Sequence, residues 1–323
     1  MRSRERSILR TVLGSVAGIV AAVLLATASP APAADLIGPG DYVITQESPA
    51  ARQAARSKTA GAAIFLLKRS GQISTLAKPP AVAGPRGIRV DNDGTLVFAD
   101  PIGGAIRRLT RDGTVRTVLQ GKPLAEPKDV AIDRDGGYVI ADFPSFAART
   151  GAKILKLSRD GKIETLHAGT PLIWPHGVAV DENGNIIIAD HACCIYRLAP
   201  SGEIKLVARG GPLVAPQDIK IAANGSYVVT DIGLVLNAKG VADRARSRNP
   251  GKLLRVSPSG QVSVIAMLPR ARFRAVAPAA DGGWLVVDMA GNALYRYDAR
   301  GQRETVFQGP PLSEPAGVVE VNR

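Results

Sequence analysis

Residues 175–190 read PHGVAVDENGNIIIAD, and this stretch decides the fold. A short apolar run begins at Pro175, and a second apolar run ends at Asp190. The Asn183-Gly184 dipeptide between them predicts a tight hairpin turn that needs positive φ. Two short apolar runs joined by such a turn predict a pair of antiparallel strands.

The same pattern recurs along the whole chain. Its copies begin at Pro85, Pro127, Pro175, Pro216, Phe273 and Pro315, at spacings of 42, 48, 41, 57 and 42 residues. Each complete copy continues through an aliphatic-x-basic strand, a second turn and a fourth strand. Self-similarity at this period is typical of propeller blades with four strands each.

The two ends of the chain complete the sixth unit. Residues 315–323 supply only a first strand, whereas residues 41–45 predict a second strand without a first. Strands three and four are predicted over 64–67 and 72–76. We therefore predict an all-β, six-bladed β-propeller of four-stranded antiparallel blades over residues 41–323. The C-terminal strand joins the N-terminal blade and closes the ring, which removes an open sheet edge.

These turn glycines and core strands resemble those of the NHL-repeat six-bladed propellers. The pattern is also similar to that of the gluconolactonase/senescence-marker family and the streptogramin lyases. The resemblance covers residues 41–323. It implies a ligand-binding face built from the starts of the first strands and the loops after the second strands.

The N-terminus predicts an export signal over residues 1–33. Four arginines among the first ten residues precede an apolar run of about 16 residues. A small-x-small cleavage site, Ala31-Pro32-Ala33, follows. The alternative is an uncleaved membrane anchor, for which the run is slightly short. We expect residues 34–40 to be a short lead, and the mature protein to be periplasmic or extracellular without stable membrane insertion.

The chain is strongly basic. Its formal net charge is +13 at pH 7, and loss of four arginines and one glutamate with residues 1–33 leaves +10. This charge favours an anionic small molecule or an acidic surface as the partner, and a protein partner is possible. The basic residues recur once per repeat instead of clustering, so we expect no nucleic acid. We expect a monomer.

The residue after each opening Pro or Phe is expected to line the mouth of the central channel. We predict that five of these positions bind a ligand: Arg86, Lys128, His176, Gln217 and Arg274, with Ala316 in the sixth blade. Alternatively, hairpin register would pair each base with the acid that ends the second strand, as a support between strands. The expected acids are Asp100, Asp142, Asp190, Asp231 and Asp288, with Thr45 at the matching place in the sixth blade.

Blade three carries the candidate catalytic residues. His176 and His191 are expected near Asp190, so a His–Asp general base is one interpretation. A structural histidine paired with Asp190 is the other.

Three loops after second strands are long, and they alternate with short ones around the ring, so they could form a lid. One of them carries Phe143 and Phe146, and Trp174 lies in the neighbouring entering loop. This aromatic group marks the ligand corner that we expect.

Cys193 and Cys194 are adjacent and are the only cysteines. They could form a vicinal disulfide, bind a soft metal with His191, or remain free thiols. We predict the disulfide.

The lactonase resemblance implies a divalent cation held by an early Glu and by Asn and Asp after the opening Pro. This chain has mostly bases at those positions, so we expect neither a metal nor another cofactor. Two functions remain. The first is a propeller that binds an anionic small molecule or a partner surface. The second is a metal-poor hydrolase or lyase of a small cyclic substrate, with His176 or His191 as the base.

Overall fold

The computed structural model describes residues 36–47, 61–234 and 249–322. The predicted export signal lies outside the described residues, as do parts of two of the three long loops. Within the described ranges there is no helix with the length and apolar character needed to cross a bilayer.

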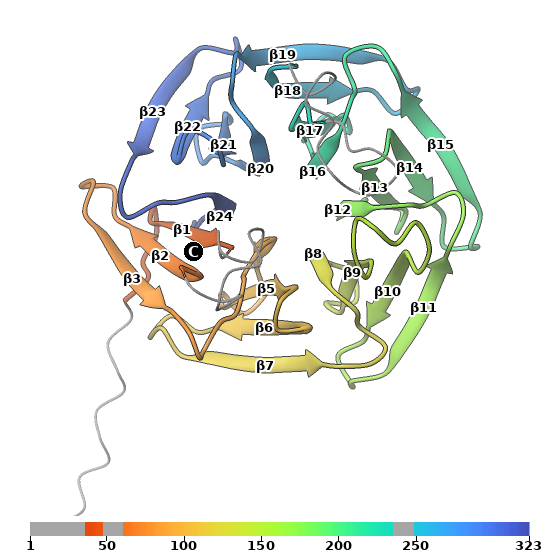
Figure 1. Ribbon diagram of the computed structural model, residues 1–323, viewed down its shortest axis with the longest axis horizontal. Coiled ribbons are helices and arrows are strands. Elements are labelled where there is room, and N and C mark those ends of the chain that lie inside the picture. The colour runs from red at the N-terminus through yellow and green to blue at the C-terminus, as the bar shows by residue number, and fades with distance from the viewer. Residues whose placement is uncertain (1–35, 48–60, 235–248, 323) are drawn as a thin grey trace, which may run out of the picture. The chain divides into compact units, whose positions relative to one another are not determined.

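Six antiparallel sheets of four strands each form a ring (Figure 1). The innermost strands surround the axis, and they are β4 (Ile88–Val90), β8 (Pro127–Ile132), β12 (Pro175–Val180), β16 (Pro216–Ile221), β20 (Phe273–Pro278) and β24 (Pro315–Glu320). The second strands are β5 (Leu96–Asp100), β9 (Tyr138–Asp142), β13 (Ile186–Asp190), β17 (Tyr227–Asp231), β21 (Trp284–Asp288) and β1 (Tyr42–Gln46). The predicted six-bladed propeller is confirmed.

The two outer strands of each blade follow in chain order. The third strands are β6 (Ala105–Leu109), β10 (Lys153–Leu157), β14 (Cys194–Leu198), β18 (Gly251–Val256), β22 (Ala293–Tyr297) and β2 (Ala63–Leu67). The fourth strands are β7 (Val115–Gln120), β11 (Ile163–Ala168), β15 (Ile204–Arg209), β19 (Val262–Leu268), β23 (Arg303–Gln308) and β3 (Ile73–Ala77). Blades one to five begin at β4, β8, β12, β16 and β20, and blade six contains β24, β1, β2 and β3.

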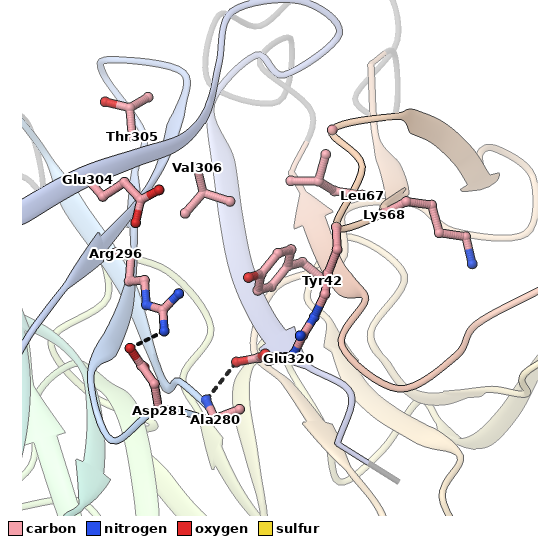
Figure 2. Close-up of a pocket in the computed structure, with 12 residues that line it drawn as sticks. Tyr42, Leu67, Lys68, Ala280, Asp281, Arg296, Glu304, Thr305, Val306 and Glu320 are labelled. Atoms are coloured by element: carbon pink, nitrogen blue, oxygen red, sulfur yellow. Dashed lines mark hydrogen bonds and ion pairs between the residues drawn. The ribbon is translucent and has the colours of Figure 1, made fainter.

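The C-terminal strand closes the ring as predicted. β24 pairs with β1 in an antiparallel register that places Glu320 opposite Tyr42. Figure 2 shows the same strand beside blade five, where Glu320 Oε2 accepts a hydrogen bond of 2.8 Å from the backbone N–H of Ala280. A cavity of ≈ 520 Å³ lies in this groove, and Arg296 pairs with Asp281 along its wall.

Six apolar clusters lie between neighbouring blades and hold them together. The second strands are buried along their length, whereas the fourth strands are half exposed. Burial on both faces explains why the second strands are continuous apolar runs. The turn between β12 and β13 has Gly184 at φ 78°, as the Asn-Gly dipeptide predicted.

Candidate functional site

The first two strands of most blades pair one residue out of the expected register. In blade three Pro175, not His176, lies opposite Asp190, and His176 occupies a β-bulge. The same bulge follows Pro127 in β8, Pro216 in β16 and Phe273 in β20. An extra residue bends the strand and redirects its side chain. The expected pairing of channel bases with the acids of the second strands is therefore wrong.

The acids at the ends of the second strands instead bind loop backbone. The carboxylate of Asp190 accepts hydrogen bonds from the N–H groups of Ile173 at 2.7 Å, Trp174 at 3.1 Å and Ala192 at 2.9 Å. Burial raises the pKa of Asp190. The histidines make other contacts, described below, so the expected His–Asp arrangement does not form.

The bulges place the predicted residues together at one end of the channel. We call this set the inner ring: Arg86, Lys128, His176, Gln217, Arg274 and Ala316. Their side chains are buried and line a channel cavity of ≈ 20 Å³. The five predicted ligand-binding positions of the inner strands are thus neighbours.

A second ring of residues follows the second strands, and the sequence analysis identified only part of it. This upper ring contains Glu47, Pro101, Phe143, His191, Ile232 and Met289, all buried. In blade six Gln46, not Thr45, occupies the place of the aspartates, because Gln46 lies opposite Pro315 and its Oε1 accepts from Ser313 N–H at 2.6 Å. Glu47 consequently enters the ring. The upper ring can be found from the sequence as the residue that directly follows the end of each second strand.

Glu47 joins two cations of the inner ring. Its Oε1 accepts from Arg86 Nε at 3.0 Å and its Oε2 from Arg86 Nη2 at 2.9 Å. The same Oε2 accepts from Arg274 Nη2 at 2.6 Å. Arg274 also donates to Met289 Sδ at 3.2 Å. One carboxylate therefore lies between two guanidinium groups, and among these three side chains positive charge exceeds negative charge.

Lys128 is another buried cation of the inner ring, and only 5% of the residue is accessible to solvent. Its Nζ donates to Glu126 Oε2 at 2.7 Å and lies 4.5 Å from the centre of the Phe143 ring. Burial and the nearby charge of Arg86 lower the pKa of Lys128 to about 8. Both forms of the amine are therefore populated near neutral pH.

The two histidines pack under the predicted aromatic corner. Phe146 stacks on His176 with ring centres 5.4 Å apart and meets His191 edge-on at 5.3 Å. Trp174 lies 5.5 Å from Phe146 and 6.0 Å from His191. Burial, together with the charge of the inner-ring arginines, lowers the pKa of His176 well below its usual range and that of His191 to about 3. Both imidazoles are neutral at physiological pH.

Several buried polar atoms at the mouth have no hydrogen-bond partner in the described part of the chain. They are Arg86 Nη1, His176 Nε2, His191 Nε2 and Trp174 Nε1. Gln217 Nε2 donates to His191 Nδ1, which places the imidazole proton of His191 on Nε2. Three of these four atoms are then N–H donors without acceptors.

Cys193 and Cys194 are joined as a disulfide where the turn after β13 meets the start of β14, two and three residues after His191. Cys194 packs in the apolar cluster that also contains Trp174 and Phe143. Within the described ranges no group of three or more His, Cys, Asp or Glu side chains is arranged to hold a metal ion. The expectation of no metal stays a prediction.

Residues 172–194 match the NHL repeat family. The chain contains an NHL repeat. The match covers the first hairpin of blade three, which carries Trp174, both histidines and the cysteine pair. A comparison with curated proteins finds no match.

Solved structures share the propeller fold at low identity. One is virginiamycin B lyase from Staphylococcus aureus, a catalytically inactive histidine-to-alanine variant with quinupristin, at 19% identity and TM-score 0.54 over 72% of this chain and 73% of that chain. A nidogen/laminin complex matches at 17% identity and TM-score 0.65, over 86% of this chain and 97% of that chain. A Xanthomonas campestris gluconolactonase matches at 18% identity and TM-score 0.58, over 77% of this chain and 84% of that chain.

Proposed function

We propose that this propeller binds an anionic small molecule at the channel mouth, between the inner and upper rings. The observation that carries the proposal is the set of buried donors without acceptors, Arg86 Nη1 and His191 Nε2 above all. A buried donor that lacks a partner costs about 1–3 kcal/mol. A carboxylate or phosphate oxygen would supply the missing acceptor.

The charge at the mouth supports the same ligand class. Arg86, Lys128 and Arg274 carry positive charge, and Glu47 and Glu126 are their carboxylate partners. Both histidines are neutral, so among these five charged side chains one positive charge remains in excess when Lys128 is protonated. In a buried site this excess attracts anions more strongly than it would in water. The narrow, buried position favours a small molecule over an acidic protein surface.

A second candidate is a hydrolase or lyase of a small cyclic molecule. Its support is the histidine pair beneath Phe146 and the fold shared with a lyase that a histidine-to-alanine change inactivates. A general base works best with a pKa near the working pH. The pKa of His191, about 3, makes it a weak base, and Asp190 orients neither histidine. Binding without turnover is therefore the preferred function.

The test measures the melting temperature of the propeller with lactate, benzoate, inorganic phosphate or calcium chloride. We expect at least one anion to raise the melting temperature and calcium to leave it unchanged. The Arg86→Gln/Arg274→Gln double variant should bind that anion more weakly by about 1–3 kcal/mol, the range for lost charge-assisted hydrogen bonds. Arg296→Gln, on the outer part of blade five, is the matched control. The proposal would be overturned if calcium raised the melting temperature and none of the anions did.

The proposal places this activity outside the cytoplasm, in a monomer without nucleic-acid contacts. Its basis is the basic, apolar and small-x-small sequence of residues 1–33, which lie outside the described residues. Intact-mass measurement of the exported protein should show a chain that begins at Ala34. A mass that includes Met1 would contradict export with cleavage.

A further inference from the structure

We infer that the channel mouth captures a small α-keto acid as an imine on Lys128. This inference rests on the proposed anion binding at the same site. It names the ligand class by adding a carbonyl group to the carboxylate.

Lys128 has the surroundings of a nucleophilic amine. Its Nζ is buried against the Phe143 ring and lies in the inner ring with Arg86. Hydrophobic surroundings and a nearby cation both favour the neutral amine, which is the form that attacks a carbonyl. The lowered pKa of Lys128, about 8, agrees with this environment.

The partner of Lys128 is able to exchange protons. Glu126 Oε2 lies 2.7 Å from Nζ, and 45% of the Glu126 side chain is exposed to solvent. Lys220 is a useful contrast because burial lowers its pKa as well. Its Nζ is held by Asp218 at 2.6 Å, and that carboxylate is only 10% exposed. Lys220 is therefore fixed as a structural cation, whereas the carboxylate beside Lys128 reaches solvent.

Arg86, which lines the same cavity as Lys128, offers a donor for the ligand carboxylate. Arg86 Nη1 is a buried donor without an acceptor in the described residues, and the charge of Arg86 acts directly on Lys128. An α-keto acid has its carbonyl carbon bonded to its carboxylate carbon. A carboxylate held by Arg86 would thus bring the carbonyl toward the amine.

Imine formation needs only Lys128, Glu126 and the keto acid, and it releases one water. Glu126 takes a proton from the Lys128 ammonium, and the Nζ lone pair forms a C–N bond while the carbonyl π electrons move to oxygen. A proton passes from nitrogen to that oxygen to give the carbinolamine. Glu126 returns its proton to the hydroxyl, water leaves, and a protonated imine remains.

The experiment treats the full-length protein with pyruvate and sodium cyanoborohydride at pH 8, then locates the reduced adduct by peptide mapping. The hydride adds to the imine carbon and makes the link permanent. Lys153 is the matched control, because it lies in the same blade and its Nζ donates to Pro123 O at 2.7 Å. Labelling of Lys128 should exceed that of Lys153 about tenfold or more, because burial and the charge of Arg86 favour the neutral amine of Lys128.

Two variants and one competitor complete the test. Lys128→Arg keeps the positive charge and should abolish the adduct, whereas Lys153→Arg should not. Excess lactate, which has no keto group, should suppress labelling. Labelling of Lys128 no greater than that of Lys153 overturns the inference in every case. If calorimetry then still detects lactate binding, the proposed function stands; if it detects none, both proposals fail.

Discussion

Two charged layers lie on the propeller axis, and they differ in how their charges are paired. The deeper layer is a quartet of two bases and two acids, Arg89, Lys220, Asp129 and Asp218. Arg89 donates to Asp129 at 2.6 Å, and Lys220 donates to Asp218 at 2.6 Å. The backbone N–H group of Val178 donates to Asp129 Oδ2, and that of Val276 donates to Asp218 Oδ2.

The layer at the mouth has an excess of bases and keeps donors unpaired. In the quartet only Asp129 Oδ1 lacks a donor among the described residues, and it packs against Gly87. The quartet therefore acts as a structural plug, since each charge is balanced by a neighbour. The mouth keeps unpaired donors among the described residues, and we propose that a ligand supplies their acceptors. Buried charge alone therefore does not indicate a binding site; buried donors without acceptors do.

The largest expected effect comes from breaking the quartet. Asp218→Ala leaves Lys220 and part of Arg89 without their carboxylate, so the free energy of unfolding should fall by about 3–5 kcal/mol. Urea denaturation measures the change. Asp135→Ala, at an exposed turn, is the control and should stay within about 0.5 kcal/mol of the wild type. Equal losses in both variants would show that the quartet is no more structural than a surface pair.

A smaller loss is expected where an acid binds only loop backbone. Asp190→Ala removes the acceptor of three N–H groups, and we expect a loss of about 2 kcal/mol in the free energy of unfolding. Lactate affinity, measured far from the unfolding transition, should be unchanged because the Asp190 carboxylate binds loop backbone and, among the described residues, no imidazole nitrogen. If Asp190→Ala kept the free energy of unfolding of the wild type but lost lactate binding, Asp190 would belong to the binding site.

Glu47 sharpens the comparison because it is the acid that partly balances the mouth. Glu47→Gln keeps the shape and removes one negative charge beside Arg86 and Arg274. Lactate affinity should rise about tenfold, or about 1.4 kcal/mol, as measured by calorimetry. Glu304→Gln on an exposed strand should change little. A fall in affinity in Glu47→Gln would mean that Glu47 orients the arginines more than it neutralises them.

The smallest expected effect is a pH dependence of stability from the buried histidines. The pKa of His191 is about 3 in the folded protein and near 6.5 in the unfolded chain, so the unfolded chain binds more protons between these values. Stability should therefore fall as the pH drops below 6.5, by about 1 kcal/mol at pH 5.5 for this residue.

The His191→Gln variant isolates this contribution. Its free energy of unfolding should decline less steeply between pH 6.5 and 5.5 than that of the wild type. Parallel pH profiles for the two proteins would show that His191 titrates normally in the folded state.

The fold and most of the inner ring could be predicted because both depend on period. The opening Pro or Phe, the turn glycines and the split sixth blade identify the six sheets, and the position after each opening residue locates Arg86 and Lys128. The partners of these bases could not be predicted in the same way. A bulge adds one residue to a strand without changing its apolar pattern, so the shift away from Asp190 has no clear mark in the sequence.

Glu47 was missed for a related reason. Blade six is built from both termini, and its second strand ends in Gln46 where the other five end in aspartate. The expected end at Thr45 was one residue short. The contact between Glu47 and Arg274 joins positions 227 residues apart, a distance at which local pattern carries no information.

A crystal of the protein soaked in 4-bromobenzoate tests the central claim most directly, because anomalous scattering from bromine locates the ligand without ambiguity. We predict bromine at the channel mouth, with a carboxylate oxygen accepting hydrogen bonds from Arg86 Nη1 and His191 Nε2. A larger cavity of ≈ 550 Å³ lies at the other ends of the inner strands, lined by Arg89, Lys220 and aliphatic side chains. Bromine found there, with the mouth empty, would contradict the claim that unpaired donors define the anion site.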